Sequence, residues 1–145
     1  MKHFIFILLT GNLLLIYACN QPPPYQQQEI IAAMQKYDDQ LMKMNTDSIA
    51  FMYSPDGELG EVAKGRDSIS RFLKKFAEFR VLSNHSQTTQ IVITGDSAIQ
   101  KGNYKQVTIL PSKDTVKLSG QFTANWIRLS PGGWRIKKMV TIPDK

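Results

Sequence analysis

The chain contains a single cysteine, Cys19, and it stands directly behind the apolar run 4–18. Lys2 and His3 precede this run, which gives the first 18 residues the layout of an export signal. The apolar run is shorter than the roughly 20 residues that a membrane-spanning helix needs, and no second such run follows. We therefore predict that residues 1–18 are a signal peptide. The part that folds after it has no disulfide and depends on a packed core.

The four residues Ile16-Tyr17-Ala18-Cys19 resemble the bacterial lipoprotein signal. The resemblance implies that the chain is cut before Cys19 and that fatty acyl chains such as palmitate on this cysteine anchor it in a membrane. We expect a protein of the bacterial cell envelope, at the outer membrane, because Asn20 replaces the aspartate that holds some lipoproteins at the inner membrane. The alternative is an ordinary cleaved signal with a chance cysteine.

Residues 19–28 comprise the cysteine and a segment rich in proline and glutamine. Three consecutive prolines favour an extended conformation, so this segment is predicted to be a tether. Residues 29–145 then fit one domain, since typical domains hold roughly 100 to 150 residues.

The first half of this domain has helical periodicity. Apolar residues recur at steps of four and three from Ile30 to Met44, which predicts a helix with one buried stripe that includes Tyr37. A shorter helix with Ile49, Met52 and Tyr53 follows, and the segment 54–57 is expected to end it as a turn. After an extended piece at 58–64, a third helix begins at 65–68. Its predicted buried stripe is Ile69, Phe72, Leu73 and Phe76.

The second half alternates as strands do. Segments 90–94 and 97–110 are predicted to form a hairpin at Gly95-Asp96, and apolar residues occupy every second position from Val116 to Trp126. A turn at 131–133 leads into a last strand at 134–140. The expected fold class is α+β, with three helices on one side of a curved, mostly antiparallel sheet.

The order of several short segments resembles the SnoaL-like branch of the nuclear transport factor two superfamily over about residues 29–139. The segments are 51–57, 64–69, 95–98, 102–104, 125–128 and 133–136. The resemblance implies a cone-shaped domain, in which a strongly curved sheet wraps around three N-terminal helices and leaves a pocket at the wide end. Members include isomerase-like, dehydratase-like and hydrolase-like enzymes as well as domains that only bind ligands or pair, so the fold does not settle the function.

In enzymes of this type a carboxylate on the extended piece after the second helix acts as a base, and the resemblance places Glu61 near that position. Strand alternation leaves both orientations of Glu61 open. Inside the pocket, burial would raise its pKa toward neutrality. On the rim, it would pair with Lys64 or Arg66, and this is the position that we expect.

The other pocket candidates are Tyr37, His85, Tyr104 and Trp126. Tyr37 would either donate a hydrogen bond into the pocket or belong to the core with its hydroxyl bonded elsewhere. His85 would be a general base or ligand contact, or simply part of the polar stretch 83–89.

The sequence has no set of residues with the spacing of a metal site and no glycine-rich phosphate loop, so we expect neither a metal nor a cofactor. Its net charge of +6 comes partly from basic groups at 64–80 and 135–138, which would form a solvated face or contact phospholipid or a polyanion. Nucleic acid is not an expected partner of an exported protein.

Three functions remain open. The first is a lipid-anchored, non-catalytic module that binds a small apolar or amphipathic ligand or a protein partner. The second is a cofactor-free isomerase, dehydratase or hydrolase with Glu61 as base. The third is a structural homodimer that pairs through apolar outer faces of its sheet.

Overall fold

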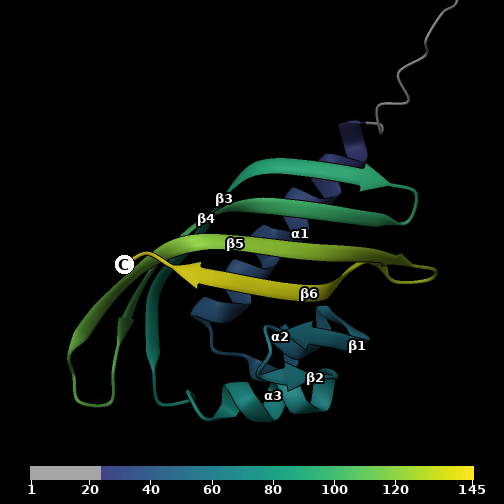
Figure 1. Cartoon of the computed structure of the whole chain (residues 1–145). Helices are drawn as coiled ribbons and strands as arrows, with labels where there is room; N and C mark the ends of the chain where they lie inside the picture. Colours follow the sequence, from purple (N-terminus) through teal and green to yellow (C-terminus); the bar gives the residue numbers. More distant parts are fainter. Residues whose placement is uncertain (1–23) are drawn as a thin grey trace, which may run out of the picture.

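Three helices precede a six-stranded sheet in this computed structural model, which describes residues 24–145 (Figure 1). The helices are α1 (Pro24–Met42), α2 (Thr46–Phe51) and α3 (Arg66–Lys74). The predicted signal peptide, Cys19 and the first part of the predicted tether lie outside the described residues. None of the helices described is long and apolar enough to cross a membrane.

Helix α1 begins at Pro24, six residues before Ile30, where the predicted apolar stripe starts, so residues 24–28 are helical and not an extended tether. Proline explains the difference, because its fixed φ suits the first turn of a helix, where its missing N–H is not needed. The predicted stripe is confirmed, since Ile30, Met34 and Tyr37 are buried. Met44 ends the segment with a φ of 48°, and Asn45 then caps α2 by accepting a hydrogen bond from the Ser48 amide.

The expected turn at 54–57 is instead part of strand β1 (Tyr53–Leu59). This strand pairs in parallel with β6 (Gly133–Pro143), and its register is irregular between Tyr53 and Glu58. Gly57 lies at the irregularity, where a Cβ would come within 2.9 Å of the Ile136 carbonyl oxygen. The glycine therefore allows close approach of two strands and does not mark the end of a helix. A tight turn then leads to β2 (Ala63–Lys64).

The remaining strands form an antiparallel meander. They are β3 (Arg80–Thr94), β4 (Ser97–Ile109) and β5 (Thr115–Leu129), followed by β6. The hairpin at Gly95, which has a φ of 58°, is confirmed. Strand β3 begins ten residues before the predicted start, because its polar part pairs with β4, as His85 does with Lys105. The register shifts between Val81 and Ser83 and between Thr88 and Gln90.

The sheet order is β2-β1-β6-β5-β4-β3, and α1 crosses one face of it (Figure 1). Strands β3, β4 and β5 bend strongly, so the sheet curves around the helices as the predicted α+β fold requires. Its inner face buries Phe122, Ala124 and Trp126 of β5, which confirms the predicted alternation.

Helix α3 packs less deeply than its periodicity suggested. Ile69 and Leu73 are buried, whereas Phe72 and Phe76 are half-buried, so the prediction that both phenylalanines are core residues was wrong. The helix lies at the rim of the curved sheet, where Phe72 packs against aromatic residues of the segment that follows the helix. Phe72, Phe76 and Phe79 form two edge-to-face pairs, with ring centroids 5.4 and 5.3 Å apart.

Candidate functional site

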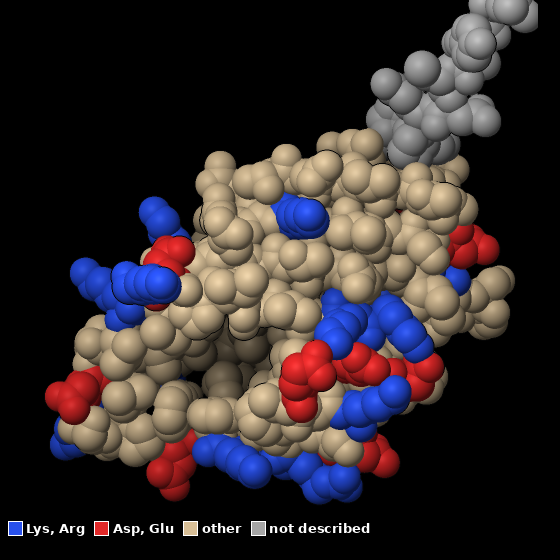
Figure 2. Space-filling view, viewed as in Figure 1, with Lys and Arg blue, Asp and Glu red and all other residues tan. Residues whose placement is uncertain are grey.

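A cavity of about 350 Å³ lies between α1 and the inner face of the sheet; we call it the cone cavity. A second hollow of about 270 Å³ adjoins it toward α3 and shares Leu41, Gln106 and Leu118 with it. Figure 2 shows the surface hollowed between the bent ends of the long strands and α3. The site is thus open to solvent on the side of the rim.

The walls of the cone cavity are mainly apolar. They are formed by Met34, Leu41, Leu59, Leu118, Phe122 and Met139, together with the half-buried ring of Tyr104. Polar groups from α1 and β3 gather in one part of the lining: Tyr37, Asp38, Asn84 and Ser86. An apolar enclosure with a few convergent polar groups is the usual composition of a small-molecule site.

Asp38 supplies the carboxylate in this lining and is 6% exposed. Its Oδ1 accepts hydrogen bonds from Asn84 Nδ2 at 2.6 Å and from Ser86 Oγ at 2.8 Å, and its Oδ2 accepts one from the Ser86 amide at 2.8 Å. Burial raises the pKa of the Asp38 carboxyl above its ordinary value, although the bonds from Ser86 and Asn84 oppose the shift. The three bonds also tie α1 to β3.

Tyr37 precedes Asp38 on α1, and its hydroxyl lies 3.2 Å from the hydroxyl of Tyr53. The two rings pack edge to face, and burial raises the pKa of both phenols, which therefore stay neutral. When Tyr53 donates this bond, Tyr37 keeps its own proton for an acceptor in the cone cavity. Tyr37 is thus both a buried core residue and part of the cavity lining.

Of the remaining pocket candidates, some line the cone cavity and others do not. Tyr104 lines the cone cavity, and partial burial raises the pKa of its phenol. Trp126 does not line it: the indole is 2% exposed, and its Nε1 donates to Gln100 Oε1 at 3.0 Å. The position of Trp126 is therefore that of a core residue.

His85 lies on the opposite face of β3 from the cavity. Its neighbours Asn84 and Ser86 line the cone cavity, whereas His85 is exposed, as strand alternation requires. It is not among the side chains that a ligand in the cavity would touch.

Glu61 stands in the turn between β1 and β2, and its side chain is 89% exposed. Its Oε1 accepts a hydrogen bond from Lys138 Nζ at 2.7 Å, whereas Lys64 pairs with Glu58 at 3.1 Å. Glu61 therefore lies outside the cone cavity, and its partner is Lys138 and not Lys64 or Arg66. In Figure 2 acidic and basic side chains intermingle over this part of the molecule.

The outer face of the sheet is polar and basic along β4 and β5. Lys101, Lys105 and Lys117 are all exposed there, on the face opposite to Tyr104. Apolar exposure on this face is found at Val92 and Ile99 near the β3–β4 turn and at Ile142 near the end of β6. The apolar outer face on which the homodimer hypothesis was based is thus interrupted by polar and charged residues.

Sequence reasoning missed Asp38, Tyr53, Asn84 and Ser86. Two signals were nevertheless present. Asp38 adjoins the apolar stripe of α1, and Asn84 and Ser86 are two residues apart, which places them on one face of a strand. The cluster was hidden because its residues are 46 and 48 positions apart along the chain.

Comparison with known proteins supports the fold. The profile of the SnoaL-like domain family matches residues 28–140. No curated protein matches the chain. A ketosteroid isomerase-like protein from Erwinia carotovora atroseptica is similar in structure, with 15% identity, a TM-score of 0.75, and coverage of 85% of this chain and 99% of that one.

Two further solved structures are similar, with comparable sequence identities and TM-scores. An NTF2-like protein with a cystatin-like fold from Novosphingobium aromaticivorans has 17% identity and a TM-score of 0.67, with coverage of 81% of this chain and 80% of that one. A protein from Catenulispora acidiphila in complex with S-DNPA has 17% identity and a TM-score of 0.68, with coverage of 84% and 96%. With the family profile spanning most of its length, the chain belongs to the SnoaL-like domain family and has the NTF2-like fold.

Proposed function

We propose that this domain binds a small amphipathic molecule in the cone cavity. The observation that carries the proposal is an apolar cavity of about 350 Å³ with polar groups in one part of its lining. The apolar body of the ligand would lie against Leu118, Phe122 and Met139, and its polar end would meet Tyr37 and Asp38. Pockets that hold small molecules have volumes of roughly 300–1,000 Å³, so the ligand must be small.

Two observations favour binding over catalysis. Glu61, the base that the family resemblance suggested, is on the surface in an ion pair. Asp38 is held by three hydrogen bonds, which fix its position and make it a weaker base than burial alone would. The complex of the similar Catenulispora acidiphila protein with S-DNPA supports a ligand-binding role in this fold.

A cofactor-free enzyme is the alternative, with Asp38 in the role first assigned to Glu61. The observation in its favour is a carboxyl of raised pKa in the cavity lining, directly after a tyrosine whose neutral hydroxyl also lines the cavity. A base and a hydrogen-bond donor placed in this way would suit proton transfer in an isomerase, dehydratase or hydrolase.

The binding test uses a neutral apolar fluorescent probe, N-phenyl-1-naphthylamine, and the substitution Leu118→Trp. Leu118 contributes to both hollows, so a larger side chain there should weaken probe binding by at least about tenfold. Val92→Trp is the matched control, because Val92 is similarly exposed, 49% against 43%, but lies on the outer face. No binding by the unmodified protein, or equal loss in both variants, would contradict the proposal.

Turnover separates the two functions. On a panel of enolisable and hydrolysable apolar substrates, we expect no turnover by the unmodified chain. Turnover by the unmodified chain would establish the enzyme instead, and its loss in Asp38→Asn but not in Glu61→Gln would assign the reaction to the cone cavity.

We also propose that the domain is held at the bacterial envelope by acylated Cys19. Helix α1 begins only five residues after Cys19, so an acyl anchor there would keep the domain near the membrane surface. Cys19→Ser should abolish acylation, which mass spectrometry detects, and release the domain into the soluble envelope fraction. If the variant stays in the membrane fraction and its mass shows no loss of lipid, this part of the proposal is overturned.

A further inference from the structure

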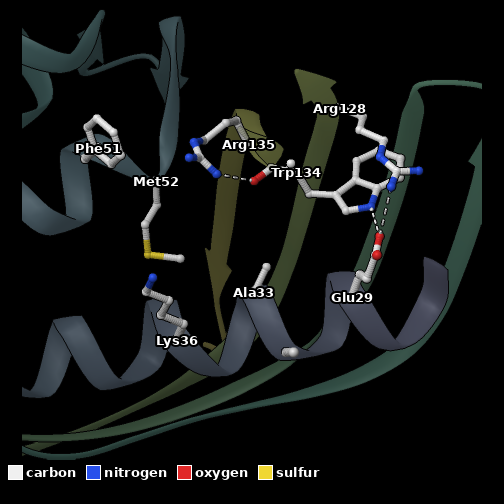
Figure 3. Close-up of a pocket in the computed structure, with 10 residues that line it drawn as sticks. Glu29, Ala33, Lys36, Phe51, Met52, Arg128, Trp134 and Arg135 are labelled. Atoms are coloured by element: carbon white, nitrogen blue, oxygen red, sulfur yellow. Dashed lines mark hydrogen bonds and ion pairs between the residues drawn. The ribbon is translucent and has the colours of Figure 1, made fainter. Parts of the chain in front are cut away.

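A separate hollow of about 460 Å³ lies on another side of α1, between this helix, α2 and the turn between β5 and β6 (Figure 3). We call it the basic-aromatic pocket. The residues that give it its character are Glu29, Lys36, Phe51, Arg128, Trp134 and Arg135. Ala33 and Met52 also line it.

Helix α1 supplies different stripes to the two sites. Glu29, Ala33 and Lys36 lie at steps of four and three and line the basic-aromatic pocket. Met34, Tyr37 and Leu41 follow the same spacing and line the cone cavity. No residue lines both, so the two sites are separate parts of the molecule.

Two cations in this pocket have no carboxylate partner within ion-pair distance among residues 24–145: Lys36 and Arg135. Arg135 Nη1 donates a hydrogen bond to the Trp134 carbonyl oxygen at 3.0 Å, and its guanidinium lies over the ring of Phe51. Figure 3 shows Lys36 and Arg135 extending from opposite sides toward the space beside Met52. This end of the pocket therefore carries positive charge that no carboxylate of residues 24–145 neutralises in an ion pair.

The other end of the pocket is neutralised. Arg128 Nη2 lies 3.7 Å from Glu29 Oε2, and the same oxygen accepts a hydrogen bond from Trp134 Nε1 at 3.1 Å. This arrangement holds the indole in place along the pocket wall. A charged ligand group is thus directed to Lys36 and Arg135 and not to Arg128.

Apolar surface connects the two ends. Phe51 is 59% exposed, an unusual position for a phenylalanine, and its ring is covered only in part by Arg66 and Arg135. Ala33 projects into the pocket between Phe51 and Trp134 (Figure 3). A flat or chain-like apolar group could bury this surface while its charged group stays with the two cations.

We propose that the basic-aromatic pocket binds an organic anion, a phosphate or carboxylate carried on an aromatic or aliphatic body. The arginine guanidinium presents paired N–H donors that match such groups, and Lys36 adds a second positive charge. The anion is either a free small molecule or the headgroup of an anionic phospholipid. This site takes a charged ligand, in contrast to the cone cavity, and the inference is independent of the function proposed there.

The first arm of the test is an NMR titration of the full chain with phenyl phosphate. The chain has two tryptophans, and their indole N–H signals give an internal comparison. The Trp134 signal should shift because its indole lines the pocket, while that of Trp126, buried and bonded to Gln100, should stay. Inorganic phosphate alone should bind more weakly, because it lacks the apolar body.

The double variant Lys36→Gln, Arg135→Gln should weaken binding of phenyl phosphate by at least about tenfold, since two charged donors are lost. The matched control is Lys105→Gln, Lys117→Gln, which removes the same charge from exposed positions on the outer face of the sheet. It should leave the affinity unchanged.

The second arm distinguishes the sources of the anion. A full chain with Cys19→Ser is sedimented with vesicles of phosphatidylcholine alone or with added phosphatidylglycerol. Binding to the anionic vesicles that depends on Lys36 and Arg135 identifies the headgroup, and binding of phenyl phosphate alone identifies a free anion. The inference fails if neither phenyl phosphate nor the anionic vesicles bind, if phenyl phosphate binds without moving the Trp134 signal, or if both double variants lose binding equally.

Discussion

Asp38 should contribute strongly to the stability of the domain, and Asp38→Ala tests this. The substitution removes the acceptor of three hydrogen bonds and leaves three donors, the Asn84 side-chain amide, the Ser86 hydroxyl and the Ser86 backbone N–H, without their partner. Each unsatisfied buried donor costs about 1–3 kcal/mol. Relief from burying a carboxylate, and water that enters from the cavity, offset part of this cost. We expect a loss of about 2–4 kcal/mol in the free energy of unfolding.

The loss should also depend on pH. Burial raises the folded-state pKa of Asp38 above its ordinary value of 3.8, so between these values the folded protein binds more protons than the unfolded chain. The contribution of Asp38 to stability is then complete below the ordinary pKa and decreases as the pH rises through the folded-state value. Asp38→Ala should therefore destabilise the domain more at about pH 4 than at about pH 7.

Urea unfolding followed by circular dichroism measures both effects. Asp39→Ala is the matched control, because Asp39 is the next residue on α1 and is exposed, so its substitution should change stability by less than about 0.5 kcal/mol. A loss below about 1 kcal/mol for Asp38→Ala, or a loss that grows as the pH rises, would refute the role assigned to the buried carboxylate.

Three further substitutions test the packing and the surface. Gly102→Ala should destabilise the domain by more than about 2 kcal/mol in urea unfolding, because a Cβ at this position would lie 2.2 Å from the Gln87 carbonyl oxygen and 2.6 Å from the Phe122 ring; a neutral effect would contradict the close strand packing. Phe72→Ala should cost about 1–3 kcal/mol, less than a fully buried phenylalanine, because Phe72 is only half-buried at the rim; a loss above about 4 kcal/mol would place it in the core. Glu61→Gln should leave the binding of N-phenyl-1-naphthylamine unchanged, since its side chain is 89% exposed outside the cavity, and a weaker affinity would bring Glu61 back into the site.

The fold could be predicted from local patterns where those patterns reflect burial. The stripe of α1 and the alternation of β5 both follow from residues that face one core, and both are confirmed. Prediction failed where a residue type has two uses. Pro24 starts a helix instead of extending a tether, and Gly57 allows two strands to approach instead of ending a helix.

The candidate site was predictable only in part, because some of its contacts join segments that are far apart in the sequence. Tyr37 was identified because it lies on the apolar stripe of its helix, and Tyr104 was named among the pocket candidates; both line the cone cavity. Asp38 was missed because its place beside the apolar stripe does not show that its carboxylate, and not that of its exposed neighbour Asp39, has partners on another element. The difference arises from β3, which brings Asn84 and Ser86 to one of the two carboxylates. Spacing along one segment carries no information about such a partner.

Asp38 also determines how the function of the cone cavity should be tested. Asn in its place keeps one acceptor for Asn84 and Ser86 Oγ but turns an N–H group toward the Ser86 amide, which is itself a donor. Loss of activity in Asp38→Asn would therefore combine chemistry with local disruption. Tyr37→Phe leaves the three hydrogen bonds of Asp38 between α1 and β3 in place, and the contact it takes away is the one with the buried Tyr53 hydroxyl. A ligand whose polar end bonds to Tyr37 should therefore bind more weakly to Tyr37→Phe, while the domain stays folded with the Asp38 hydrogen bonds in place. This result would distinguish a binding site from a structural polar cluster.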